Sequence, residues 1–250
     1  TLSSWEVGFL LDKIYLEKSN AEIALISGSK EPEGADPDIV YRLKEMGMNV
    51  AVTGDEDIDN ADPPRRSSYT KEVLESDQIK LLIISATVDS ANVLDEYLDV
   101  DVPILTLEQA IVDDMQIGAA GGGFSELREW AVLDNTHPIT DELSVGNIVV
   151  QESPKDGLPG QLVYILDPLT DGASKLIASP DDSTQYTLVT VDEGIPLLDG
   201  NPAPNRRAFL GLSDWNLGAD VATDQTWQIF DATVEWLIAG ETSIMDWSLY

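Results

Sequence analysis

One short apolar run constrains the fold of this chain more than any other feature. Leu81–Ile84 is unbroken and apolar, small and polar residues follow it directly, and Asp89-Ser90 then open a helical pattern. A strand that is apolar on both faces is typical of a parallel sheet covered by helices. Ligand crevices in such sheets lie at the carboxyl ends of the strands. We therefore expect a ligand crevice, if the chain has one, at Ser85, Thr87 and Asp89.

The first half of the chain alternates strand and helix patterns at short spacing. Helix starts are predicted at Asp36, at Ser90 and at Leu107, the last running to Met115. Strands are predicted at Ala21–Ser27, Asn49–Thr53, Leu81–Ile84 and Pro103–Leu105. Strands and helices in alternation require right-handed crossovers between parallel strands. We therefore expect a mostly parallel central sheet with helices on both faces.

Beyond Gly118 the pattern changes to short strands and turns. Gly118–Gly123 is expected to be a flexible loop, and a final helix is expected to begin at Thr223 or Asp224. Its predicted buried stripe contains Trp227 and Phe230, with Trp236 outside the stripe. Extra strands are predicted at Trp130–Leu133, Asn147–Gln151, Gln161–Leu166, Lys175–Ala178, Tyr186–Val191 and Arg207–Leu212.

The order of these segments resembles the class I glutamine amidotransferase-like superfamily and, within it, the ThuA-like group. The resemblance covers roughly Ala21–Ala239 and implies a flavodoxin-like three-layer α/β sandwich. We accordingly divide the chain into an N-terminal arm (1–19), an amidotransferase-like domain (20–240) and a C-terminal tail (241–250). The segments that carry the resemblance are AEIALIS, LLIISATV, the PIL strand, HPIT with Leu143, RRAFLGL and DQTWQIFDATVEWL.

The resemblance places Glu108 where the catalytic members of the superfamily have a cysteine. Thr106 and Ala110 replace the glycines that flank that cysteine, and the chain contains no cysteine at all. Without a thiolate no acyl-enzyme can form, so amidotransferase activity is excluded. The absence of cysteine also excludes disulfides and thiolate metal sites.

Two residues are weak candidates for catalysis. Glu108 would lie at the carboxyl end of a strand, where it would join the crevice as a base or ligand. It would equally serve as an acidic residue at a helix N-terminus, stabilising the helix dipole. His137, the only histidine, would act as a base with Asp134 or Asp141, or would shape a turn with Pro138. For both residues we favour the structural alternative.

The net charge of −32, from 46 acidic and 14 basic residues, restricts the partners of the chain. Nucleic-acid binding requires a basic surface, and an anionic membrane surface is disfavoured for the same reason. No apolar run reaches the ~20 residues of a membrane span, so membrane insertion is not expected. Solubility in a salty, marine or halophilic medium explains this charge more simply than binding of divalent cations.

A calcium site is the one cofactor that the acidic segments suggest. Asp55, Asp57 and Asp59 stand at alternate positions, as oxygen ligands do in calcium loops. The EF-hand pattern would next require a glycine and a bidentate glutamate, where this chain has Asn60 and Arg66. We expect no cofactor, with calcium at these aspartates as the alternative.

Aromatic residues occur in both terminal segments. Trp5 and Phe9 lie in the N-terminal arm, and Trp247 and Tyr250 lie in the tail. Aromatic anchors of this kind suit docking onto a neighbouring subunit. We therefore expect a non-catalytic structural or interaction module, extracellular or at the cell surface, that forms homo-oligomers or joins a larger assembly. The alternative is a ThuA-like protein that binds or processes carbohydrate in a crevice near Glu108.

Overall fold

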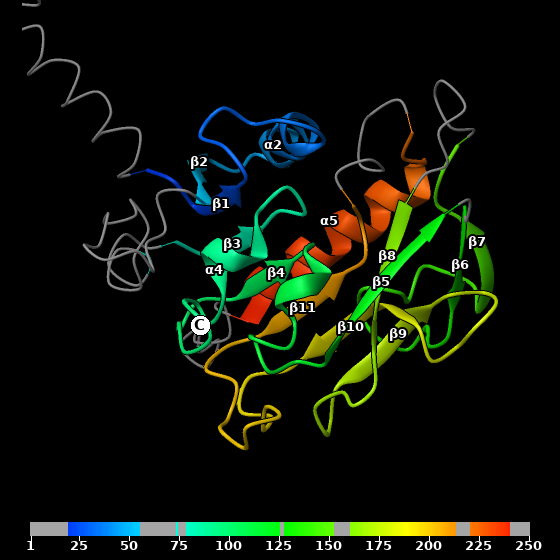
Figure 1. Ribbon diagram of the computed structural model, residues 1–250. Coiled ribbons are helices and arrows are strands. Elements are labelled where there is room, and N and C mark those ends of the chain that lie inside the picture. The colour runs from blue at the N-terminus through cyan, green and yellow to red at the C-terminus, as the bar shows by residue number, and fades with distance from the viewer. Residues whose placement is uncertain are drawn as a thin grey trace, which may run out of the picture.

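The computed structural model describes residues 20–55, 74, 79–125, 128–152, 161–213 and 221–240. Its main feature is an 11-stranded sheet with the order β2-β1-β3-β4-β11-β10-β9-β6-β7, in which β8 pairs with β10 and with β5 (Figure 1). The strands are β1 (Ile23–Ser27), β2 (Val50–Gly54), β3 (Leu81–Ile84), β4 (Ile104–Thr106), β5 (Ala119–Ser125), β6 (Glu129–Val132), β7 (Gly146–Val149), β8 (Gln161–Leu166), β9 (Ser174–Ala178), β10 (Tyr186–Val191) and β11 (Arg207–Leu210).

Strand direction changes at β11. The pairs β2–β1, β1–β3, β3–β4 and β4–β11 are parallel. From β11 to the far edge at β7 every pair is antiparallel, and the β8 pairings with β10 and β5 are antiparallel too. The sheet is therefore mixed and largely antiparallel, and the predicted flavodoxin-like sandwich with a mostly parallel core is wrong.

The reason for this difference lies in the connections. A parallel pair needs a long crossover, usually a helix, whereas antiparallel strands are joined by turns. Helices within the described residues are α2 (Asp36–Glu45), the short α4 (Ser90–Val93) and α5 (Asp224–Ala239), with a 3₁₀ turn, η2 (Gln109–Ile111). The helix predicted over 107–115 shrinks to that 3₁₀ turn, and no helix separates the strands from β5 to β11 in the described part of the chain.

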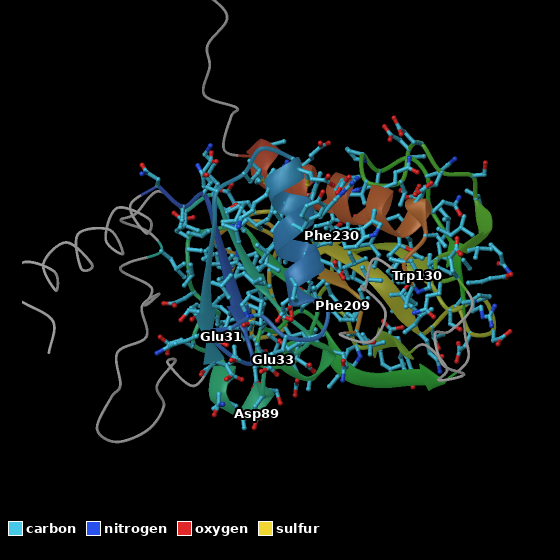
Figure 2. All side chains as sticks on the ribbon, turned by 90° about the horizontal axis from the view of Figure 1, so that it is seen from above. Glu31, Glu33, Asp89, Trp130, Phe209 and Phe230 are labelled. Atoms are coloured by element: carbon cyan, nitrogen blue, oxygen red, sulfur yellow. The ribbon has the colours of Figure 1, made fainter. Side chains whose placement is uncertain are left out.

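Alternate residues of the parallel strands pack on opposite faces of the sheet. On one face, Ile23 and Leu25 of β1 pack against α2 and α5. The residues that these two helices contribute to the cluster include Ile39, Leu43, Phe230 and Val234. Ala24 and Ile26 face the other side, where α4, η2 and β8 supply Val93, Ile111 and Ile165. Figure 2 shows α2 and α5 on the same face of the sheet, with Phe230 in α5. The two helices thus cover one face, and short turns with the β5–β8 pair cover the other.

The glycine-rich segment predicted to be a flexible loop is strand β5 instead. Gly121 faces the backbone of β8 so closely that a Cβ atom there would lie 2.0 Å from the carbonyl oxygen of Tyr164. At Gly122 the nearest atom to an added Cβ would be the Tyr164 hydroxyl oxygen, at 3.1 Å. Glycine in a strand is used where another backbone or an aromatic ring approaches closely, so this tract serves strand pairing.

Candidate functional site

The hydroxyl groups of the predicted crevice lie at the carboxyl end of β3, around the carboxylate of Asp36. Ser85 Oγ donates to Asp36 Oδ1 at 2.5 Å, and Thr87 Oγ1 donates to Asp36 Oδ2 at 2.7 Å. Asp36 is only 1% exposed and is the first residue of α2, while the N-cap is Ala35. A carboxylate at a helix N-terminus complements the helix dipole. Asp36 therefore joins α2 to the end of β3 instead of facing solvent.

The loop after β1 closes over the same hydroxyls. The backbone N–H of Gly28 donates to Thr87 Oγ1 at 2.9 Å. A Cβ atom at Gly28 would lie 2.3 Å from the carbonyl oxygen of Thr87, so no larger residue fits between these two segments. The Ser85 and Thr87 hydroxyls are thus hydrogen-bonded to Asp36, and Thr87 also to Gly28; a crevice at these residues remains a prediction.

Asp89 makes a second set of contacts at this edge of the sheet. Its backbone N–H donates to Asp55 Oδ2 at 2.5 Å, and its own Oδ1 accepts from the Ala91 N–H at 3.0 Å as the N-cap of α4. Asp55 is 2% exposed. Figure 2 places Asp89 on the same side of the molecule as Glu31 and Glu33. Asp89 thus caps α4, and Asp55 joins the end of β2 to the turn that follows β3.

The proposed calcium ligands are only partly within the described residues. Asp55 is described, whereas Asp57 and Asp59 lie outside the described residues. Across 20–55, 74, 79–125, 128–152, 161–213 and 221–240, no group of three or more His, Cys, Asp or Glu side chains is arranged to hold a metal ion. Calcium binding at the aspartates remains a prediction.

Glu108 follows β4 and forms the N-cap of η2. Its Oε1 accepts from the Ala110 N–H at 2.7 Å, and its backbone N–H donates to Thr106 Oγ1 at 3.2 Å. The residue is 8% exposed. A side chain that accepts a backbone N–H two residues on is a capping interaction. Glu108 therefore caps η2, and its part in a ligand crevice remains a prediction.

His137 lies away from these residues, in a turn between β6 and β7. Its Nδ1 accepts from the Ile139 N–H at 3.3 Å, and its ring packs against Trp236 of α5 with centroids 5.1 Å apart. Burial lowers the pKa of His137 below its usual 6.5, although the carboxylates of Asp192, Asp134 and Asp141 act in the opposite direction. Trp236, expected outside the buried stripe, is buried by this turn.

A groove of about 450 Å³ lies between α2, the turn that follows His137, and α5. We call it the acidic groove, because five of its residues are carboxylic and one is basic. That volume falls within the range of ~300–1,000 Å³ usual for ligand pockets. Its lining consists of Arg42, Pro138, Ile139, Asp141, Glu142, Asp224, Trp227, Gln228, Asp231, Ala232 and Glu235.

The cation of the groove is bound within the protein. The Arg42 guanidinium donates through both Nε and a terminal nitrogen to the Asp231 carboxylate, with 2.9 Å between Nε and Oδ1. Its Cζ atom lies 6.0 Å from the Trp227 ring centroid. The Asp231 carboxylate raises the pKa of Arg42 above its usual value. The groove thus shows how a guanidinium is held there, by a bidentate carboxylate beside an aromatic face.

The sequence analysis missed the acidic groove because its walls come from three separate segments. One signal was present within α5: Asp224, Trp227, Asp231 and Glu235 recur at intervals of three or four residues. Residues at that spacing share one helix face. Acidic residues at this spacing, opposite an apolar stripe, indicate a helix face that stays outside the core.

Comparison with protein-family models and with curated protein sequences finds no match for this chain. The resemblance to the glutamine amidotransferase-like superfamily therefore rests on the sequence segments alone. No helix within the described ranges has the length and hydropathy that a membrane crossing requires. The expected interaction residues Trp5, Phe9, Trp247 and Tyr250 lie outside the described residues.

Proposed function

We propose that the chain is a non-catalytic interaction module that holds a positively charged segment of a partner in the acidic groove. The observation that carries this proposal is a contrast between two sets of carboxylates. Asp36 and Glu108 accept hydrogen bonds from the protein's own hydroxyl and N–H groups. Asp141 and Glu235, by contrast, are exposed side chains on the wall of a groove.

The charge of the groove selects the sign of the ligand. Five carboxylic residues and one arginine line the groove, and the whole chain carries a net charge of −32. A concave surface of one sign concentrates counter-charged ligands and steers their approach. Lysine or arginine side chains would meet the carboxylates, and the Trp227 face would receive a cation as it receives Arg42.

The terminal segments extend this proposal to assembly. Aromatic residues in 1–19 and 241–250 would dock on neighbouring copies or on other subunits of a parent assembly. An acidic surface suits an extracellular or cell-surface position in salty surroundings, where screening weakens repulsion between copies.

Carbohydrate binding is the second candidate, and Trp227 is the observation that favours it. An indole ring beside carboxylates offers a stacking surface and hydrogen-bond acceptors for a sugar. Glu108, around which the sequence analysis expected the sugar crevice, is instead engaged with Ala110. A sugar ligand would therefore bind in the acidic groove.

Isothermal titration with an arginine hexapeptide tests the leading proposal. The variant Asp141→Asn/Glu235→Gln removes two exposed groove carboxylates, and Asp171→Asn/Glu193→Gln removes two exposed carboxylates elsewhere. Exposed charge pairs contribute about 0.2–1 kcal/mol each, so the groove variant should bind roughly fivefold more weakly at 150 mM salt. The matched variant should bind like the wild type.

Equal weakening in the two variants would reject the groove, since attraction to overall charge would then explain all of the binding. A panel of neutral oligosaccharides titrated in parallel addresses the second candidate. Saturable sugar binding that is lost in Trp227→Ala, with no peptide binding, would replace the leading proposal with carbohydrate recognition.

A further inference from the structure

The turn of residues 134–143, here the His137 turn, has one side in the acidic groove and the other against α5. Pro138, Ile139, Asp141 and Glu142 line the groove. The His137 ring packs on Trp236 at a centroid separation of 5.1 Å and an interplanar angle of 57°. A change in the charge or packing of His137 therefore acts directly on Pro138, the adjacent residue in the groove wall.

Hydrogen bonds hold the His137 turn in one shape. Thr140 donates its N–H to the His137 carbonyl at 2.9 Å and its hydroxyl to the Asp134 carbonyl at 2.7 Å. The Ile139 N–H donates to His137 Nδ1 at 3.3 Å. An imidazole nitrogen accepts a hydrogen bond only when it carries no proton, so this contact requires neutral His137 with its proton on Nε2. A second proton, on Nδ1, would face the Ile139 N–H and remove the bond.

Charged groups from several segments surround the ring. The Arg206 guanidinium, before β11, lies with Cζ 4.8 Å from the Trp236 ring centroid and is paired with Asp192, its Nε 3.5 Å from Oδ1. Arg206 disfavours a protonated His137, whereas Asp192, Asp134 and Asp141 favour it. Burial of the ring outweighs these carboxylates and lowers the pKa of His137.

The stability of the His137 turn falls on acidification. Because the folded pKa of His137 lies below the ordinary 6.5, the unfolded or loosened turn binds the proton more readily than the ordered turn. The stability that neutral His137 contributes is then fully present above pH 6.5 and is lost as the pH falls through the lower folded value.

We propose that His137 makes the acidic groove release its cationic ligand on mild acidification. Uptake of one proton removes the Ile139 hydrogen bond and loosens the wall that carries Ile139, Asp141 and Glu142. The inference rests on the proposed function of the groove. His137 acts as a positioning residue, and it is the only histidine of the chain, so a histidine-like transition has a single source.

The first test measures arginine hexapeptide affinity at pH 7.5, 6.5 and 5.5. His137→Phe keeps a ring against Trp236 but does not titrate, and His137→Asn keeps an acceptor for the Ile139 N–H. The wild type should bind the hexapeptide more weakly at pH 5.5 than at pH 7.5, because proton uptake by His137 removes its hydrogen bond with the Ile139 N–H. In each of the two variants, the affinity at pH 5.5 should be nearly equal to the affinity at pH 7.5. Equal losses in all three proteins would overturn the inference.

The second test needs no ligand and separates this inference from the proposed function. Amide hydrogen exchange of Ile139 and Thr140 is followed against pH, corrected for intrinsic rates. Protection should fall on acidification in the wild type and stay constant in His137→Phe. If the peptide fails to bind at any pH while protection still falls, the proposed function fails and the pH response of the turn stands. Protection that is unchanged in the wild type overturns the inference whatever the peptide does.

Discussion

Replacing Asp36 with alanine tests whether the carboxyl edge of the parallel strands is a structural element. The change removes the acceptor of the Ser85 and Thr87 hydroxyls, which lie in buried and partly buried contacts. Hydrogen bonds to a charged group contribute about 1.5–3 kcal/mol each, and the carboxylate at the helix N-terminus adds about 0.3–1 kcal/mol. The free energy of unfolding should therefore fall by about 3–7 kcal/mol in urea denaturation.

Asp38→Ala is the matched control, because Asp38 is also acidic and in the first turn of α2 but is partly exposed. It should cost less than Asp36→Ala, because interactions of a partly exposed carboxylate contribute only about 0.2–1 kcal/mol. A double-mutant cycle of Asp36→Ala with Thr87→Val should give a coupling energy of roughly 0.5–3 kcal/mol, as for residues in one network. Small and equal losses of unfolding free energy in Asp36→Ala and Asp38→Ala would show that the Asp36 hydrogen bonds to Ser85 and Thr87 do not stabilise the fold.

Three further predictions follow from particular contacts. Gly121→Ala should destabilise β5–β8 pairing far more than Gly122→Ala, as measured by amide exchange of β8. In Gly121→Ala the new Cβ would lie 2.0 Å from the backbone oxygen of Tyr164, whereas in Gly122→Ala it would lie 3.1 Å from the movable Tyr164 hydroxyl. Arg42→Gln should cost about 0.5–1 kcal/mol, less at high salt, because the Arg42–Asp231 pair is partly exposed, at 34% and 21%. Asp134 accepts hydrogen bonds from the Thr136 N–H and hydroxyl, which lower its pKa below the ordinary 3.8. The stability that this carboxylate gives to the His137 turn should be fully present above pH 3.8 and be lost as the pH falls through the lower folded value; exchange of the Thr136 amide in wild type and Asp134→Asn, followed from pH 6 downward, checks this.

Local apolar patterns predicted the strands of the fold well. Leu81–Ile84 is β3, and the runs around Tyr186–Val191 and Arg207–Leu210 are β10 and β11, because buried strands leave continuous or alternating apolar residues in the sequence. The expectation of a mostly parallel sheet was wrong, because the pairs from β11 to β7 are antiparallel. Strand direction depends on the connections, and the turns between these strands favour antiparallel pairing over the helical crossovers that parallel pairs need.

Two failures have identifiable causes. Gly118–Gly123 looked flexible because glycine lacks strand propensity, whereas β8 supplies the Tyr164 ring and backbone that fit against Gly121 and Gly122. The helix expected from Leu107 ended after η2, with Val112, Met115 and Ile117 all buried in the core but not in a helix. In both segments tertiary contacts outweighed local preference.

The candidate site could be predicted only in part. The sequence pointed to Ser85, Thr87 and Asp89 through the rule for parallel strands, and the structure joins them to Asp36, Gly28 and Asp55 within the fold. The acidic groove depends on Arg42, the His137 turn and α5 meeting in space, and no local pattern reports such a meeting.

We propose that the acidic groove, and not the carboxyl edge of the parallel strands, is the binding surface. A ¹H–¹⁵N spectrum of the intact chain, titrated with the arginine hexapeptide at pH 7.5, tests this proposal. Saturating shifts are expected at the Trp227 indole, at Ile139 and at Asp231, with Gly28, Thr87 and Ala110 unchanged. Shifts confined to Gly28, Thr87 and Ala110, or spread evenly over the acidic surface, would show that the groove is not the binding surface.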